Sequence, residues 1–224
     1  GTGSALTMEL FDLPLIWAFI IGFGIIMYVL MDGFDLGVGM LSMFARSEEE
    51  RSYMMATIDS TWHANQTWLV LTGGMMFGAF PLFYSVILSS LYIPIMAMLF
   101  AFMIRGVALD YYGHSERKPL WGLAFGLGSL LVTLAQGFAL GGLLAGLNVT
   151  NGQFTGSVIR SWLNPLAGFV TVGVLFGYLM LGASYLILRT EGELQQRSYR
   201  YAWPTSIVTV LISVGVYLWL IARY

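Results

Sequence analysis

The sequence predicts an all-α integral membrane protein: a polytopic bundle of about six transmembrane helices with its N-terminus outside. Hydrophobic residues make up 58% of the 224 residues and charged residues only 10%, whereas a soluble domain carries about 25% charged residues. The mean hydropathy is +0.77. Apolar runs near the 20 or so residues that cross a bilayer recur between short polar segments. We therefore expect residues 1–224 to form a single transmembrane domain.

The first predicted span covers residues 14–44 and follows a tail of residues 1–12. It begins at Pro14, a residue favoured in the first turn of a helix. Residues 13–31 carry no charge, and the span is long enough to tilt or to protrude. In the polar segment that follows, Ser47 precedes Glu50 by three residues, a spacing typical of a capping box at a helix start.

The later spans are separated by prolines, polar loops and charged loops. The second has an amphipathic lead-in from Tyr53 and ends before Pro81, after which residues 83–90 are expected to form a short turn-rich link. Residues 13–147 should make a first four-helix bundle, with many glycines that suit close helix approach in the fourth span. The remaining predicted segments are the spans at 67–80, 92–110 and 121–147, an external loop at 148–164, and two further helices within 165–224, at 165–188 and 203–221, joined by a charged loop at 189–200.

The basic residues indicate the orientation. The first, third and fifth connections hold eight Lys and Arg residues, and the opposite side holds two. Because cytoplasmic segments are enriched in Lys and Arg, we expect those three connections to be cytoplasmic and both termini to lie outside. The eight are Arg46, Arg51, Arg105, Arg117, Lys118, Arg189, Arg197 and Arg200, and the two are Arg160 and Arg223.

Composition also excludes several kinds of chemistry. Cysteine is absent, so disulfides, thiolate metal sites and cysteine nucleophiles are excluded, and only two histidines occur. The sequence has no phosphate-binding loop, no metal-binding cluster and no serine–histidine–aspartate set. Nothing resembles a basic nucleic-acid surface. We therefore expect no metal site, no catalytic residue and no nucleic-acid partner for this chain.

Two carboxylates stand at the end of the otherwise apolar first span. An intramembrane carboxylate costs about 2.5–3.5 kcal/mol on insertion scales, and Asp32 and Asp35 are spaced to share one helix face. Either they hydrate at the membrane interface, or they form a protonatable or cation-holding site that faces other helices. Apolar residues continue to Phe44, which favours the second reading for Asp35.

Polar residues from three helices are predicted to converge at one membrane depth. Arg105 ends an apolar run and needs a partner. Asp110, five residues further on, does not face it on an ideal helix, so Asp32 or Asp35 is the better candidate. The expected polar cluster consists of Asp32, Asp35, His63, Asn65, Gln66, Arg105 and Asp110.

Four residues of these helices allow more than one reading. His63 could relay protons, because imidazole titrates near pH 6.5, or it could ligate haem iron or hydrogen-bond a carbonyl. Trp62 and Trp68 fit either an interfacial aromatic belt with helix packing or the flank of a quinone site. Gln136 lies in the middle of the fourth span, where it should bond another helix or a bound head group.

At the level of motifs, the chain resembles subunit II of cytochrome bd quinol oxidases, nearest the cyanide-insensitive branch. Residues 31–39 resemble the signature of the first helix in that family, and residues 62–68 resemble a second signature flanked by tryptophans. The likeness covers the chain from about Asp12 onward. It includes Gly73, Gly74, Phe77, Ala79, Phe80, Pro81, Tyr84, residues 105–108, Gln136, Gly137 and residues 185–194.

The resemblance implies a partner, cofactors and a location. Subunit II pairs with a haem-bearing subunit I, and in some cases with a small single-helix accessory subunit, among the lipids of the bacterial inner membrane. The complex oxidises quinol and reduces O2 to water, with protons taken from the cytoplasm. Haems b and d belong to subunit I. Subunit II stabilises subunit I, can hold a bound quinone and lines a cytoplasmic proton path, while this chain alone is not catalytic.

Two departures from the family pattern affect what the resemblance implies. The family has an aspartate that is its candidate for proton uptake where this chain has His63, and a glycine where it has Ala64. His63 either takes over proton uptake or only fills space. The family also has more spans than the six counted here, so the sequence fits a fragment, a short form or one piece of a split subunit.

Two other classes of function remain open at this stage. The bundle could be a transporter or channel that uses Asp32, Asp35 and Arg105 as an ion site. It could also be a purely structural membrane partner that has lost proton conduction. Copurification of a haem-bearing chain would distinguish the oxidase subunit from a transporter, and the sequence does not identify the quinone.

Overall fold

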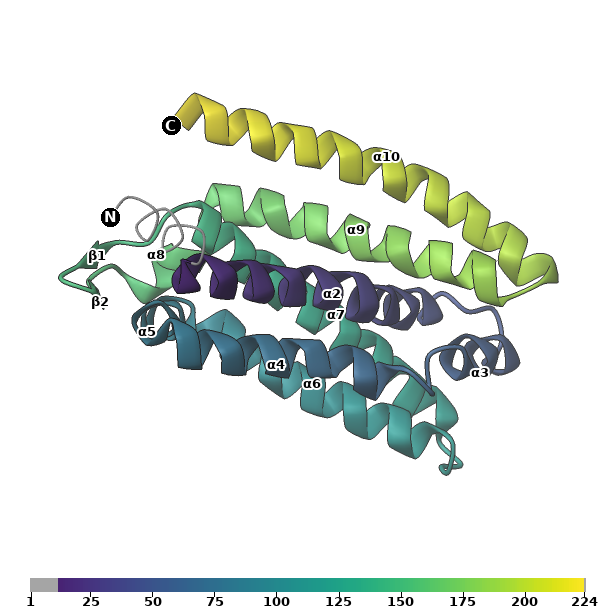
Figure 1. The fold of residues 1–224 in the computed structure, drawn as a ribbon. Helices are drawn as coiled ribbons and strands as arrows, with labels where there is room; N and C mark the ends of the chain where they lie inside the picture. Colours follow the sequence, from purple (N-terminus) through teal and green to yellow (C-terminus); the bar gives the residue numbers. More distant parts are fainter. Residues whose placement is uncertain (1–11, 224) are drawn as a thin grey trace, which may run out of the picture.

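The computed structural model describes residues 12–223, so residues 1–11 of the predicted tail lie outside the described part of the chain. Long helices run alongside one another, with short elements at both ends (Figure 1). In chain order the elements are α2 (Leu13–Ser42), α3 (Glu48–Ala56), α4 (Trp62–Ala79), α5 (Pro81–Ser90), α6 (Tyr92–Tyr112), α7 (Lys118–Leu144), β1 (Val149–Thr150), β2 (Gln153–Phe154), α8 (Val158–Trp162), α9 (Pro165–Arg189) and α10 (Gly192–Arg223).

The described residues contain five helices long and apolar enough to cross a membrane: α2, α6, α7, α9 and α10. The predicted span at 67–80 corresponds to α4, which is not among these five because its first turns are polar. It nevertheless packs against α2 within the bundle (Figure 1). The all-α membrane class is confirmed.

Two segments predicted as a link or a loop are helical, and the helix start predicted at Ser47 is confirmed. The expected link at 83–90 belongs to α5, which Pro81 starts at its first position. The lead-in before the second span is a separate helix, α3, capped by the Ser47 side chain, which accepts from the Glu50 backbone N–H at 3.1 Å. Most of the charged loop at 189–200 is the beginning of α10. Hydropathy misses these helices because it measures polarity rather than helix propensity.

The expected external loop at 148–164 contains a hairpin and a short helix. Asn151 and Gly152 both have positive φ, at 53° and 76°. This Asn-Gly pair forms the tight turn that favours a two-residue hairpin. It joins β1 and β2, which pair antiparallel with Val149 opposite Phe154. The hairpin lies with α5 and α8 at one end of the bundle (Figure 1).

The opposite end of the bundle, called the α3 end below, holds α3 and the turns that join α6 to α7 and α9 to α10 (Figure 1). Most of the basic residues used to predict orientation lie at this end. The prediction that Arg105 belongs to a connection is wrong. Arg105 lies inside α6 and is fully buried. The remaining basic residues keep the same asymmetry, so the orientation stays a prediction.

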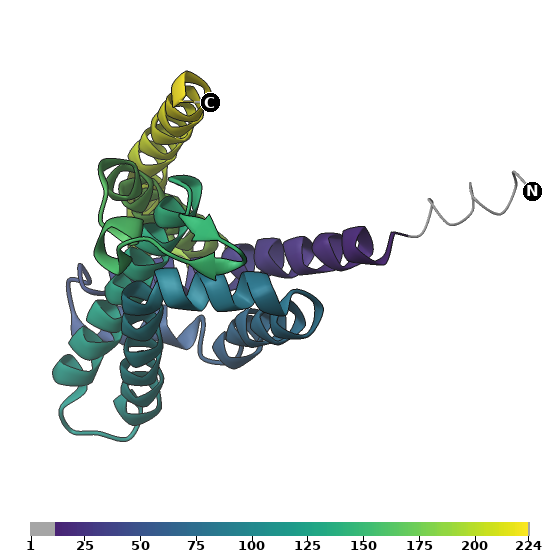
Figure 2. The same ribbon diagram turned by 90° about the vertical axis from the view of Figure 1, so that its left-hand side faces the viewer.

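Helix α2 has two different halves. Its first turns expose large apolar side chains such as Leu13 and Phe19 and extend away from the other helices (Figure 2). From Asp32 to Ser42 nearly every residue is buried. Contacts with α4, α7 and α9 surround this second half, so the centre of the bundle lies here.

Glycines allow α2 and α9 to touch backbone to backbone. A Cβ on Gly37 would overlap the carbonyl oxygen of Tyr178, and one on Gly182 would overlap the backbone of Gly37. Small residues at helix interfaces let backbones approach closely in membranes. Helix packing therefore explains why the signature at residues 31–39 has a glycine at position 37.

Gly37→Ala should destabilise the bundle by about 1–3 kcal/mol, because the added methyl has no room against α9. Gly22→Ala is the matched control in the same helix, since nothing lies within 4 Å of a Cβ built there. Unfolding of each variant in detergent, followed by circular dichroism, measures the difference. Equal loss of stability in both variants would contradict the packing role.

Candidate functional site

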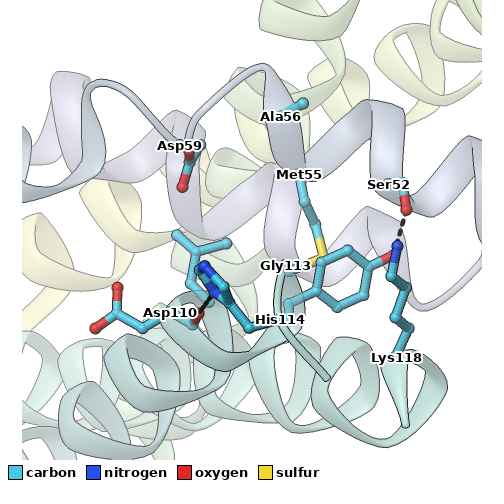
Figure 3. Close-up of a pocket in the computed structure, with 10 residues that line it drawn as sticks. Ser52, Met55, Ala56, Asp59, Asp110, Gly113, His114 and Lys118 are labelled. Atoms are coloured by element: carbon cyan, nitrogen blue, oxygen red, sulfur yellow. Dashed lines mark hydrogen bonds between the residues drawn. The ribbon is translucent and has the colours of Figure 1, made fainter. Parts of the chain in front are cut away.

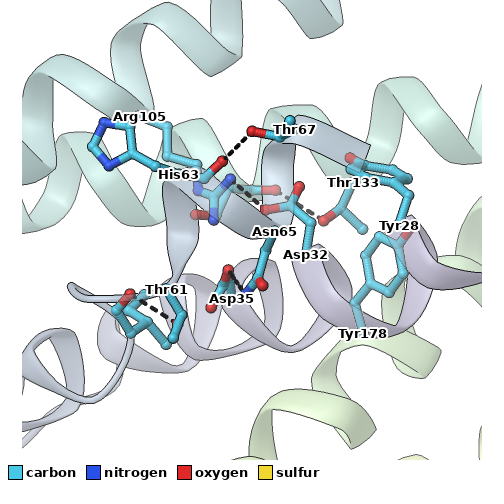
Figure 4. A network of polar contacts seen from close by, with 12 residues as sticks. Tyr28, Asp32, Asp35, Thr61, His63, Asn65, Thr67, Arg105, Thr133 and Tyr178 are labelled. Atoms are coloured by element: carbon cyan, nitrogen blue, oxygen red, sulfur yellow. Dashed lines mark hydrogen bonds and ion pairs between the residues drawn. The ribbon is translucent and has the colours of Figure 1, made fainter. Parts of the chain in front are cut away.

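The buried half of α2 carries both aspartates of the signature. Asp32 and Asp35 are each 0% exposed, which rules out the reading in which they hydrate at the interface of this chain. They lie about one turn apart and face α4 and α6 (Figure 4). The two carboxylates are therefore a buried polar site among apolar helices.

Asp32 forms a buried ion pair with Arg105 of α6. The Arg105 Nη1 donates to Asp32 Oδ1 at 2.9 Å, and the two side chains are 1% and 0% exposed. Gly128 of α7 lies against the Arg105 backbone, and the guanidinium carbon is 5.6 Å from the centre of the Phe125 ring. Of the two partners that the sequence left open for Arg105, the structure selects Asp32.

Asp35 has a neutral partner. The side-chain amide of Asn65, in the first turn of α4, donates to Asp35 Oδ2 at 2.8 Å, and Asn65 is 2% exposed. No ion pair to Asp35 occurs among residues 12–223. The two aspartates thus differ, because one is fixed by a cation and the other is held by an amide.

Asp32, Asp35, Asn65 and Arg105 form what we call the buried polar cluster. Four of its polar atoms have no hydrogen-bond partner among the described residues: Asp32 Oδ2, Asp35 Oδ1, and Arg105 Nε and Nη2. A buried polar atom without a partner is costly, and most such sites bind ordered water. The cluster therefore has free capacity to bind water or protons.

A second network lies one turn closer to the N-terminus of α2. Gln136 of α7 donates to the Tyr28 hydroxyl and accepts from Tyr178 of α9 at 2.7 Å. This confirms the prediction that Gln136 bonds other helices. All three residues also line an apolar cavity of about 240 Å3 formed by α2, α4, α6, α7 and α9.

Other predicted site residues of α4 lie outside the cluster. The exposed His63 ring points away from the aspartates (Figure 4) and stacks on Trp62 with the ring centres 3.6 Å apart. Gln66 is half-buried. Trp62 packs on Gly106, and Trp68 meets Phe23 edge to face, which supports the helix-packing reading for both tryptophans.

Asp110 also lies elsewhere. It is exposed and lines an open cavity of about 390 Å3 at the α3 end together with Asp59, His114 and Lys118 (Figure 3). The five-residue step from Arg105 turns it about 140° around α6. The predicted convergence of Asp110 with the aspartates is therefore wrong, although it occupies the same half of the bundle.

Sequence reasoning missed the two tyrosines of the Gln136 network. Tyr28 could have been found, because it precedes Asp32 by four residues and so shares its face. Tyr178 gives no such signal, since one tyrosine in an apolar helix is also typical of packing. Among residues 12–223 no group of three or more histidine, aspartate or glutamate side chains is placed to hold a metal ion.

The fold and the buried cluster define a polytopic membrane protein with an intramembrane charged site. A family model described as cytochrome bd terminal oxidase subunit II matches residues 13–222. The chain belongs to that family.

Named relatives agree with this assignment. The chain is 35% identical over 211 residues to cytochrome bd-I ubiquinol oxidase subunit 2 of Escherichia coli K12, covering 89% of this chain and 55% of the relative. It is 32% identical to cytochrome bd ubiquinol oxidase subunit 2 of Bacillus subtilis, covering 84% and 56%. The chain thus spans about half the length of the curated relatives it matches.

A solved structure shares the fold. The structure of bd oxidase from Geobacillus thermodenitrificans matches with a TM-score of 0.82 at 17% identity, covering 94% of this chain and 66% of that one. At this identity the likeness concerns the arrangement of helices alone. It independently supports the all-α membrane bundle.

Removing Arg105 should leave Asp32 as an unpaired buried charge, so Arg105→Leu should cost about 3–5 kcal/mol of stability. Adding Asp32→Leu should recover part of that loss, whereas adding Asp35→Leu should not. A double-mutant cycle on detergent unfolding measures the coupling of each pair. Equal coupling of Arg105 to both aspartates would contradict the selective pairing.

Proposed function

We propose that this chain acts as subunit II of a bacterial cytochrome bd-type quinol:O2 oxidoreductase and that the buried polar cluster belongs to a cytoplasmic proton path. The observation that carries the proposal is a carboxylate, Asp35, that is buried in a membrane helix and forms no ion pair with any described residue. Intramembrane carboxylates facing the interior of a bundle commonly serve ion or proton pathways.

The two aspartates would have separate tasks. Arg105 fixes the charge of Asp32 and so holds a stable negative–positive pair beside Asp35. Asp35 accepts one hydrogen bond from the Asn65 amide and has a second oxygen without a partner. A carboxylate held in this way keeps its position in both protonation states, because an amide partner does not require it to be charged.

Protons would reach the cluster from the α3 end. His63 and Asn65 share the first turns of α4, with His63 on the exposed side and Asn65 facing Asp35. We propose that His63 receives protons there, since imidazole titrates near neutral pH. Gln66 on the same turn and Asp110 in the neighbouring open cavity would assist uptake. The alternative remains that His63 only packs on Trp62.

The resemblance supplies the partners. We propose that a haem-bearing subunit I, in the inner membrane of a bacterium, holds haems b and d, and that this chain stabilises it; a small single-helix subunit could join them. The residues described offer little support for haem in this chain, because His63 and His114 are both exposed and lie on different helices or turns.

The apolar cavity beside Gln136 is the candidate for a bound quinone. Its lining is nearly all hydrocarbon, as an isoprenoid chain requires, and the Tyr28, Gln136 and Tyr178 polar groups border it. A few polar groups in an apolar pocket are typical of small-molecule sites. Trp62 and Trp68 pack elsewhere and are not part of this proposal.

The other two functions fit the geometry less well. A transporter built on Asp32, Asp35 and Arg105 needs a site that releases its ion, whereas Asp32 and Arg105 neutralise each other. In a purely structural subunit, a buried carboxylate that forms no ion pair with any described residue would cost stability and serve no purpose. The family membership favours the oxidase over both.

Proton transfer is tested on the assembled oxidase. Asp35→Asn should slow oxygen reduction at least tenfold, the order expected when a positioned proton-transfer group is lost, while haem content is unchanged. His63→Asp should keep turnover and shift its pH profile, and His63→Leu should slow it. Normal turnover in Asp35→Asn would refute the path, and identical pH profiles in all His63 forms would leave uptake to other residues.

Composition of the complex tests the partners. The gently solubilised complex should contain a second chain by intact-mass analysis, show a haem Soret band and yield quinone on extraction, whereas the purified chain alone should show no Soret band. Ala139→Phe fills the apolar cavity and should lower the extracted quinone at constant haem. A stoichiometric Soret band from this chain by itself would contradict the assignment of haems.

A further inference from the structure

A small basic pocket lies at the α3 end, where the connection after α2 meets the first turns of α10. Its cavity of about 110 Å3 is lined by Arg46, Glu193, Gln196, Arg197 and Arg200, and we call it the basic pocket. It is separate from the buried polar cluster, with which it shares no residue. Nothing in the proposed proton path or quinone site uses it.

Two of its three arginines form no ion pair with any residue that the structure describes. Arg197 pairs with Glu50 of α3, and its Nε is buried without a hydrogen-bond partner among the described residues. Arg46 and Arg200 are exposed and form no ion pair within residues 12–223. The three arginines thus carry more positive charge than Glu193 and Glu50 neutralise, and all three line the same small cavity.

A row of exposed side chains on α10 begins at Arg200 of the basic pocket and runs along the outer face of that helix. Arg200, Trp203, Ile207, Leu211 and Val214 follow one another at spacings of three and four, so they share a face. Trp203 is 74% exposed and Leu211 is 65% exposed. Along this face a cation is followed by an aromatic ring and then by aliphatic side chains, the order of a membrane from headgroup to interface to acyl chains.

We propose that the basic pocket binds the phosphodiester of an anionic phospholipid whose acyl chains lie along the outer face of α10. Guanidinium groups match phosphate oxygens in a bidentate manner. Basic pockets between membrane helices on the cytoplasmic side are typical sites for anionic headgroups, and the α3 end is the one predicted to be cytoplasmic. This proposal does not depend on the proposed proton path.

Glu193 narrows the class of headgroup. A carboxylate next to a phosphate site repels a bare, multiply charged anion, but it accepts hydrogen bonds from hydroxyl groups. Gln196 adds both a donor and an acceptor to the same lining. A phosphodiester that carries hydroxyls, as in phosphatidylglycerol, therefore fits the pocket better than inorganic phosphate does.

The test compares lipid retention by native mass spectrometry. The chain, in its membrane complex, is reconstituted in nanodiscs of phosphatidylcholine with a minor fraction of phosphatidylglycerol and then released. Wild type should retain phosphatidylglycerol in preference to phosphatidylcholine. Arg46→Gln with Arg200→Gln should weaken that retention by about fivefold for each charge removed. Arg46→Lys with Arg200→Lys should recover part of it.

The matched control is Arg117→Gln with Lys118→Gln, which removes the same charge from the same end of the bundle at exposed positions outside the basic pocket. It should retain phosphatidylglycerol as wild type does. Equal loss in both double variants would overturn the site in favour of a diffuse surface charge. Displacement of the lipid by equimolar inorganic phosphate would overturn it in favour of a free-anion site.

Discussion

The ion pair between Asp32 and Arg105 is the interaction on which the rest of the bundle depends. Two charges placed inside a membrane protein lose their hydration, and their attraction offsets that cost only when the geometry is good and water is excluded. Here the contact is 2.9 Å and both side chains are almost fully buried. The helices that carry the pair, α2 and α6, must therefore be held in a fixed register by their neighbours.

Glycines provide that register. Gly37 and Gly182 bring α2 and α9 into backbone contact, and Gly128 lets α7 approach the Arg105 backbone. These close contacts leave no room for lipid or for a shifted helix around the ion pair. The same glycines that look like a flexible run in the sequence thus rigidify the centre of the structure.

The two aspartates of α2 have different partners and therefore different roles. Asp35 lies on the same helix as Asp32, yet its partner is the neutral amide of Asn65. One carboxylate serves as the structural half of a salt bridge, and the other keeps an oxygen without a hydrogen-bond partner among the described residues. This difference between two similar residues supports assigning proton transfer to Asp35 and stability to Asp32.

The sequence by itself determined the class of protein and the need of Arg105 for an aspartate partner, because composition and hydropathy report which residues cannot face lipid. Only the tertiary structure decided which aspartate pairs with Arg105. It also turned His63 outward, placed Asp110 in another cavity and joined Tyr178 to Gln136. Those outcomes depend on how each helix is rotated about its axis, and the glycine contacts between helices fix that rotation.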